Sequence, residues 1–155
     1  MNSNTRLDES ELRKLGINPT YFLDSNIFLE LELDQRYADE CEALLNKVRR
    51  GLIEAVTTGF HIDSILLVME NYGMKPSDLR TFLSSLLGYK GLTIYFPSLH
   101  DRILATEYME KFGLDLDDAL AYCAMKKFDT NNIVSYDKHF NPIRDVTRLE
   151  PSQLQ

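Results

Sequence analysis

The sequence predicts an α/β domain whose sheet is parallel and covered by helices on both faces. Short apolar runs typical of strands alternate along the chain with longer segments in which apolar residues recur at helical spacing. Glycine and proline stand at most of the boundaries between them. Strands separated by helices pair in parallel, because each crossover helix returns the chain to the same edge of the sheet.

Length and composition indicate one globular domain. The chain has 155 residues, of which 44% are hydrophobic and 26% charged, both average for such domains. No run approaches the roughly 20 apolar residues of a spanning helix. The opening stretch MNSNTRLDESELRKLG lacks the hydrophobic core of a secretory signal, so we expect a cytoplasmic protein.

The first half of the chain contains the following expected elements. Residues 1–19 form a polar lead-in, with a helix over residues 9–15 that Gly16 and Pro19 end. Later boundaries come from apolar spacing and from the glycines at 51 and 73. They predict a strand at 21–23 with an exit turn at 24–26, a helix at 34–50, a strand at 52–57 and a helix at 64–72 with Ser64 near its start.

The second half continues the alternation. Pro76 opens a helix, Pro97 stops a strand and Gly113 breaks a helix. The elements expected here are helices at 76–87, 98–112 and 115–128, strands at 92–96 and 133–136, and an edge strand at 146–149.

Cysteines and charge limit the kinds of metal site. Cys41 and Cys123 lie in helix-like stretches and are expected to be buried free thiols. Without a CxxC or HExxH motif, and with scattered histidines, a structural zinc site is disfavoured, whereas carboxylates suit Mg²⁺ or Mn²⁺. The net charge of −7 argues against a protein that coats nucleic acid. A carboxylate-rich metal site nevertheless counts as negative until its cations are bound.

Two aspartates follow expected strands. Asp24 ends the strand at 21–23, and Asp137 follows the strand at 133–136. In parallel sheets, ligands bind at the carboxyl ends of strands where the strand order reverses. If these two strands are neighbours, both carboxylates enter one crevice; the alternative is that each aspartate only forms a turn.

Two further carboxylates lie on expected helices. Asp118 stands near the inner edge of its helix, although Asp115, Asp117 and Asp118 are all also suited to capping that helix or to its dipole. Glu70 shares a face with two leucines, a costly setting for a carboxylate unless it is paired or bound to a cation. A solvated edge of the helix is the alternative for Glu70. Carboxylates that converge repel one another, and a divalent cation would cancel that repulsion.

Four motifs in order resemble the PIN-domain family, and in particular its VapC-like ribonucleases. FLDSNIFLE is similar to the family's first strand, and Ser64 followed by Glu70 is similar to its second motif. Gly113-Leu114-Asp115-Leu116-Asp117-Asp118-Ala119-Leu120 resembles the third, and Ser135-Tyr136-Asp137-Lys138-His139-Phe140 the fourth. Two departures are the lead-in of about twenty residues before Asp24 and Ser135 in place of the more common threonine.

The resemblance implies a fold, an activity and a site. The fold is a three-layer α/β/α sandwich with a central, mainly parallel sheet of four or five strands, over residues 20–150, after an N-terminal extension at 1–19 and before a C-terminal tail at 151–155. The activity is a Mg²⁺- or Mn²⁺-dependent ribonuclease. The catalytic and metal-binding residues would be Asp24, Glu70, Asp118 and Asp137, with Ser25 or Asn26, and Ser135, as their hydrogen-bonding supports.

The resemblance also implies partners and leaves alternatives open. Small single-domain members are commonly toxins that pair with an antitoxin and often form homodimers, while others act in RNA processing. The rival interpretation is a PIN-fold binding or regulatory module with little turnover. A phospho-acceptor receiver domain would leave Glu70 unexplained, and a flap-type DNA nuclease would need a helical arch that this short chain lacks. For His139, covering a loop is favoured over contact with the scissile phosphate.

Overall fold

A computed structural model describes residue 11, residues 14–16 and residues 18–155. The predicted α/β fold is confirmed: five parallel strands form one sheet in the order β3-β2-β1-β4-β5. The strands are β1 (Thr20–Leu23), β2 (Glu54–Thr58), β3 (Leu92–Tyr95), β4 (Asn132–Val134) and β5 (Thr147–Leu149). The helix expected at 9–15 falls largely outside the described residues.

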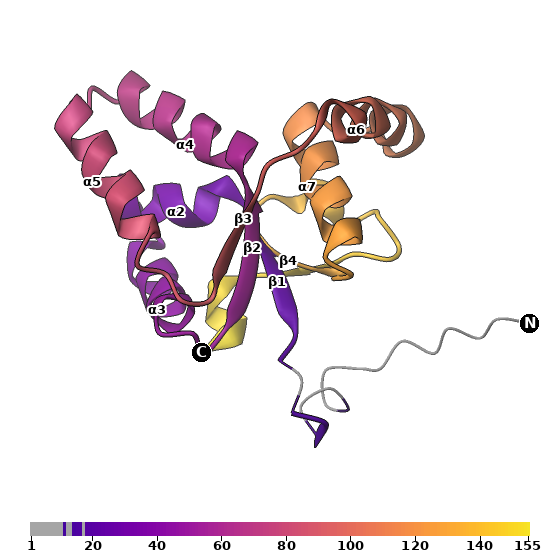
Figure 1. The fold of residues 1–155 in the computed structure, drawn as a ribbon, viewed down its shortest axis with the longest axis horizontal. Coiled ribbons are helices and arrows are strands. Elements are labelled where there is room, and N and C mark those ends of the chain that lie inside the picture. The colour runs from indigo at the N-terminus through magenta and orange to yellow at the C-terminus, as the bar shows by residue number, and fades with distance from the viewer. Residues whose placement is uncertain (1–10, 12–13, 17) are drawn as a thin grey trace, which may run out of the picture.

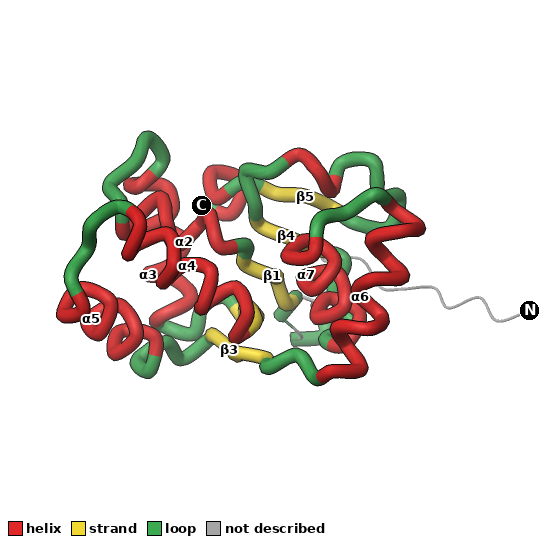
Figure 2. Tube along the Cα trace, turned by 90° about the horizontal axis from the view of Figure 1, so that it is seen from above, coloured by secondary structure: helices red, strands yellow, loops and turns green. Residues whose placement is uncertain are grey.

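The helices form a layer on each side of this sheet. Helices α2 to α5 lie on one side and α6 and α7 on the other (Figures 1 and 2). Their bounds are α2 (Ser25–Glu32), α3 (Ala38–Arg49), α4 (Gly59–Asn71), α5 (Pro76–Leu86), α6 (Leu99–Phe112) and α7 (Leu116–Lys127). None of the described helices is long and apolar enough to cross a membrane.

Each face of the sheet has its own apolar core. Side chains from β1 alternate between the two, so that Tyr21 and Leu23 pack toward α2 to α5 while Phe22 packs toward α7. The two cysteines are buried free thiols, as predicted, with Cys41 in the first core and Cys123 in the second.

Two helices differ from the prediction at their starts. The turn expected at 24–26 continues directly into α2, which the apolar spacing did not reveal. Helix α4 begins at Gly59, five residues before the predicted start, because the Thr58 hydroxyl accepts from the backbone N–H of His61 and caps it. The prediction that Ser64 lies near a helix start is therefore wrong; Ser64 lies within α4.

The C-terminal residues also have regular structure. Pro151–Leu154 form a short 3₁₀ helix, η2, that packs against α3. The Lys47 ammonium of α3 donates to the Leu154 carbonyl at 2.9 Å. A second 3₁₀ helix, η1 (Lys138–Phe140), follows β4.

The order of the strands reverses between β1 and β4. From β1 the chain adds β2 and β3 on one side, then returns to place β4 and β5 on the other. Phe22 of β1 is level with Val56 of β2 and with Ile133 of β4. Two residues further on, Asp24 is therefore level with Thr58 and Ser135. As predicted, the strands that lead to Asp24 and Asp137 are neighbours.

Candidate metal centre at the carboxyl edge of the sheet

Asp24 is a buried carboxylate at the end of the central strand. Its side chain is only 5% exposed. One oxygen accepts from the backbone N–H of Ser25 at 2.8 Å and thereby caps α2. The other accepts from the Ser135 hydroxyl at 2.6 Å and from the Asn26 amide at 3.4 Å. These donors fix the carboxylate where β1 passes into α2.

The exit of β4 is tied to the same network. The Ser135 oxygen accepts from the Asn26 amide at 3.1 Å and from the backbone N–H of Asp137 at 3.0 Å. The Asn26 side-chain oxygen accepts from the backbone N–H of Tyr136 at 3.3 Å. Asn26 and Ser135 thus fix the backbone that carries Asp137 relative to Asp24, and the Ser25 contact in this network comes from its main chain.

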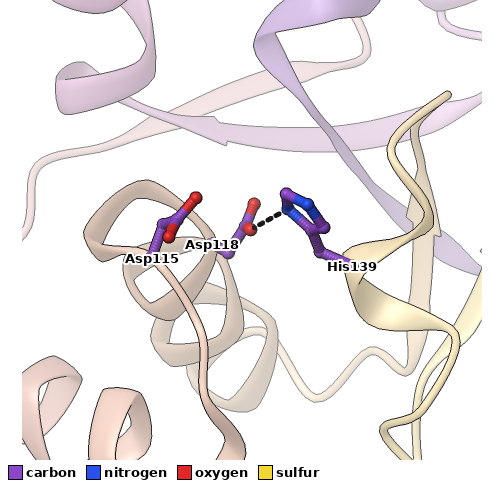
Figure 3. A group of neighbouring side chains, drawn as sticks. All are labelled: Asp115, Asp118 and His139. Atoms are coloured by element: carbon purple, nitrogen blue, oxygen red, sulfur yellow. Dashed lines mark hydrogen bonds and ion pairs between the residues drawn. The ribbon is translucent and has the colours of Figure 1, made fainter.

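Helix α7 brings Asp118 to this edge. Asp118 is 2% exposed, which agrees with its predicted place on the inner side of the helix. Asp115 has the backbone position of the helix cap without a side-chain capping bond. Figure 3 shows Asp115 at the start of α7 and Asp118 in its first turn, where Asp118 meets the His139 ring.

His139 joins the last two acidic groups. Its Nδ1 lies 3.2 Å from an oxygen of Asp118 and 3.0 Å from an oxygen of Asp137. These contacts raise the pKa of His139, first through the Asp118 hydrogen bond and then through the Asp137 charge. The structure thus places His139 against the acidic group.

The carboxylates are held in a setting that disfavours their charge. Burial, followed by the charges of Asp117 and Asp24, raises the pKa of Asp118 to about 7. Burial also raises the pKa of Asp24, although His61 and the Ser135 hydrogen bond act in the opposite direction. Buried carboxylates that repel one another have a high affinity for a divalent cation, which removes the repulsion.

Helix α4 contributes His61 to this region. His61 is fully buried, and this burial lowers its pKa, while the charge of Asp24 is the largest effect in the opposite direction. This histidine was given no role in the sequence analysis. The signal was the Thr58-x-x-His61 spacing directly after a strand, in which the threonine caps the helix and faces the ring.

The structure does not bring Glu70 to the group. Glu70 is exposed and lies in the last turn of α4, nine residues after His61 and therefore about 14 Å further along the helix axis. The costly apolar setting inferred from the two leucines before it is wrong, and the solvated alternative is correct. Because α4 starts early, its capped end rather than its C-terminal turn faces the crevice.

The side chains present fit a hard divalent ion. Among the described residues, ligand atoms of Asp115, Asp118 and His139 all lie within 4.8 Å of one another. Asp24 and Asp137 border the same edge through the contacts described above. Carboxylate oxygens are the donors that Mg²⁺ and Mn²⁺ take in proteins, and an added imidazole is compatible with Mn²⁺.

Comparison with known proteins agrees with this architecture. The sequence profile of the PIN domain family matches residues 21–146. No curated protein matches in a sequence search. Among solved structures, the Mycobacterium tuberculosis sarcin-ricin loop cleaving toxin VapC20 is similar with a TM-score of 0.65 at 12% identity, over 78% of this chain and 92% of the toxin.

Two further solved structures are also similar. A toxin–antitoxin complex from Klebsiella pneumoniae has a TM-score of 0.63 at 14% identity, and the match covers 84% of this chain and 97% of that one. VapBC-1 from nontypeable Haemophilus influenzae has a TM-score of 0.57 at 16% identity and covers 86% and 98%. At such identities the likeness establishes the fold.

Proposed function

Because this chain belongs to the PIN-domain family, we propose that it is a divalent-metal-dependent endoribonuclease that hydrolyses RNA phosphodiester bonds. The observation that carries the proposal is the pair of buried carboxylates Asp24 and Asp118, which approach from different elements where the strand order reverses. Asp137 completes the acidic group. Glu70 has no place in it.

The roles of the residues follow from their contacts. A bound Mg²⁺ or Mn²⁺ would supply a water nucleophile of lowered pKa and neutralise charge on the leaving oxygen. Asp24 and Asp118 would hold the ion, while Ser135 and Asn26 keep the Asp24 carboxylate from rotating. Asp137 presents a half-buried carboxylate and His139 an exposed imidazole at the mouth of the site, where substrate would enter.

We further propose that the enzyme is the toxin of a toxin–antitoxin pair and forms a homodimer. The support is its likeness to VapC20, described as a toxin that cleaves the sarcin-ricin loop, and to a toxin–antitoxin complex from Klebsiella pneumoniae whose match covers 84% of this chain. On this proposal the protein works in the cytoplasm. An antitoxin would be the second product of the same gene pair.

The decisive experiment is RNA cleavage with and without Mg²⁺ or Mn²⁺, comparing the wild type with Asp24→Asn and Asp137→Asn. The expected result is metal-dependent cleavage that both substitutions abolish. Glu110→Gln is a matched control, since Glu110 is exposed on α6, and it should cleave like the wild type. Equal cleavage by all proteins would mean a contaminating nuclease, and absence of cleavage of any RNA would favour the regulatory module.

The biological role is tested by expression in a host cell. Induction of the wild type should arrest growth, Asp24→Asn should not, and co-expression of the product of an adjoining reading frame should restore growth. Growth unaffected by the active enzyme would contradict the toxin role and leave the ribonuclease proposal intact.

A further inference from the structure

We propose that His61 is a direct ligand of the divalent ion through its Nε2 atom, so that the site has mixed nitrogen and oxygen ligands and binds Mn²⁺ more tightly than Mg²⁺. The inference rests on the proposed metal-dependent function and specifies the ligand set of the same site. It concerns a residue to which neither the sequence motifs nor the predicted acidic group assigned a role.

The position of His61 follows from the strand register. Thr58 ends β2 level with Asp24, and α4 begins at the next residue, so His61 in its first turn lies beside the end of β1. The charges of Asp24 and Asp117 both favour the protonated form of the ring, which agrees with this position. Asp24 follows β1, Asp117 lies in α7 and His61 in α4.

The ring is held in a fixed orientation. Its Nδ1 lies 2.5 Å from the Thr58 hydroxyl oxygen, which also accepts from the His61 backbone N–H at 3.1 Å. The Phe22 ring contacts it edge-on with 5.1 Å between centroids, and the Phe60 ring lies 5.9 Å away. A histidine that binds metal through one nitrogen is commonly oriented in this way by a hydrogen bond from the other.

The second nitrogen has no partner. Among the residues that the structure describes, His61 Nε2 is the buried side-chain nitrogen or oxygen atom that no hydrogen bond satisfies. The main chain of Asp117 lies near the ring and favours its charged form, but it does not meet Nε2 in hydrogen-bonding geometry. Leaving a buried polar atom unpaired is costly, and a histidine that served only to pack would pair both nitrogens or be replaced by an apolar residue.

Helix α4 offers no carboxylate in place of His61. Its two acidic residues, Asp63 and Glu70, are both exposed. The side chain of this helix that interacts with the Asp24 charge is therefore an imidazole, which can offer a nitrogen ligand. With its proton on Nδ1 and donated to Thr58, the ring would present the Nε2 lone pair to the ion.

Ligand chemistry then gives the metal preference. Mg²⁺ takes oxygen ligands and retains its waters, whereas imidazole is a good ligand for first-row transition ions. We expect tag-free wild-type protein to bind Mn²⁺ at least about tenfold more tightly than Mg²⁺ in calorimetric titrations. His61→Gln should reduce this ratio to near one, whereas His100→Gln, at an exposed position on α6, should leave it unchanged.

Electron spin-echo spectroscopy of bound Mn²⁺ reports nitrogen coordination directly. The chain has three histidines, so the double variant His100→Gln/His139→Gln retains His61 as its single imidazole and alters only exposed positions. The expected result is ¹⁴N modulation from a coordinated imidazole in both the wild type and the double variant. This measurement leaves the buried residue intact, so it holds even if His61→Gln fails to fold.

The outcomes separate the inference from the proposed function. Bound Mn²⁺ without ¹⁴N modulation in the wild type overturns the His61 proposal alone, provided Asp24→Asn abolishes the binding. If the modulation persists in His61→Gln and disappears in the double variant, the coordinated nitrogen belongs to His139. That result also overturns the His61 proposal. Absence of any Mn²⁺ or Mg²⁺ binding overturns both the inference and the metal-dependent function.

Discussion

Ser135 and Asp24 stand 111 positions apart in the chain, yet the Ser135 hydroxyl donates a 2.6 Å hydrogen bond to the Asp24 carboxylate. The bond crosses from the exit of β4 to the exit of β1, at the place where the strand order reverses. The Ser135 hydroxyl is one of three donors that hold the Asp24 carboxylate at the end of the central strand, together with the Ser25 backbone N–H and the Asn26 amide.

Removing the Ser135 hydroxyl should reduce RNA cleavage and metal binding more than it reduces the stability of the fold. In Ser135→Ala the buried Asp24 carboxylate loses a charge-assisted hydrogen bond, an interaction of about 1.5–3 kcal/mol. We expect RNA cleavage to fall about tenfold or more, measured as kcat/KM, with a smaller loss of Mn²⁺ affinity. Ser135→Thr keeps the hydroxyl and serves as the control. Equal losses in the two variants would indicate a packing defect instead.

Neutralising Asp118 should stabilise the metal-free protein. Its pKa of about 7 in the folded state lies above the ordinary aspartate value of 3.8, so between these pH values the folded protein holds a proton that the unfolded chain has lost. The free energy of unfolding therefore falls as pH rises through this window, and the cost is fully present above pH 7.

The test is urea unfolding in EDTA at pH 5 and pH 8. Asp118→Asn should be more stable than the wild type at pH 8, by on the order of 2 kcal/mol, and should lose less stability between the two pH values. Asp24 contributes a slope of the same sign, because its pKa is also raised. An identical pH slope in wild type and Asp118→Asn would contradict the prediction.

Divalent metal should raise the thermal stability of the wild type. An ion that binds the folded state alone stabilises it by about 2.7 kcal/mol at one hundred times its Kd. Scanning calorimetry with added Mn²⁺ should show a higher Tm that excess EDTA reverses. Asp118→Asn should show a much smaller increase, since it removes a ligand. An equal shift in both proteins would place the ion elsewhere.

Glu70→Gln should leave both cleavage and Mn²⁺ affinity within about twofold of the wild type. The side chain is exposed in the last turn of α4, away from the capped end of that helix. The comparison with Asp24→Asn, in the same assay, distinguishes the site described here from the one that the motif spacing predicted. A loss of cleavage as large as that of Asp24→Asn would restore Glu70 to the site.

Gly91→Ala should destabilise the fold. A Cβ atom at Gly91 would lie 2.2 Å from the Ile53 carbonyl oxygen and 2.8 Å from that of Val48, so the backbone entering β2 or β3 would have to shift. We expect a loss of about 2 kcal/mol or more in urea unfolding. Gly88→Ala is the matched control, because its Cβ would meet only an ordinary 3.5 Å contact. Similar stability of the two variants would contradict the predicted effect of the Gly91 contacts.

The sheet was predictable because polar turn residues in the sequence show where its apolar strands end. An apolar run followed by a polar turn identifies β1 and β4, and the parallel arrangement then makes Asp24 and Asp137 neighbours. Helix α2 was missed because its cap, Asp24, had already been interpreted as the residue of an exit turn. In the structure that carboxylate both caps α2 and raises the pKa of Asp118 through its charge.

The position of α4 could not be read from apolar spacing. Its buried residues begin at Gly59, but the most continuous apolar run starts at Ile65, so the spacing placed the helix start near Ser64. The true start depends on one hydroxyl, that of Thr58, and on its register with Asp24. Because α4 starts five residues earlier than predicted, its first turn places His61 at the carboxyl edge of the sheet, and Glu70 lies in its last turn, away from that edge.

The network that joins Asp24, Asn26 and Ser135 has a consequence for synthesis. The ribosome synthesises Asp24 early, and Ser135 follows only 111 residues later. Until then the central strand lacks one of its neighbours and the Asp24 carboxylate lacks the hydroxyl that fixes it. A chain that stops before Ser135 therefore carries an unassembled centre, and on the proposed function it would lack nuclease activity.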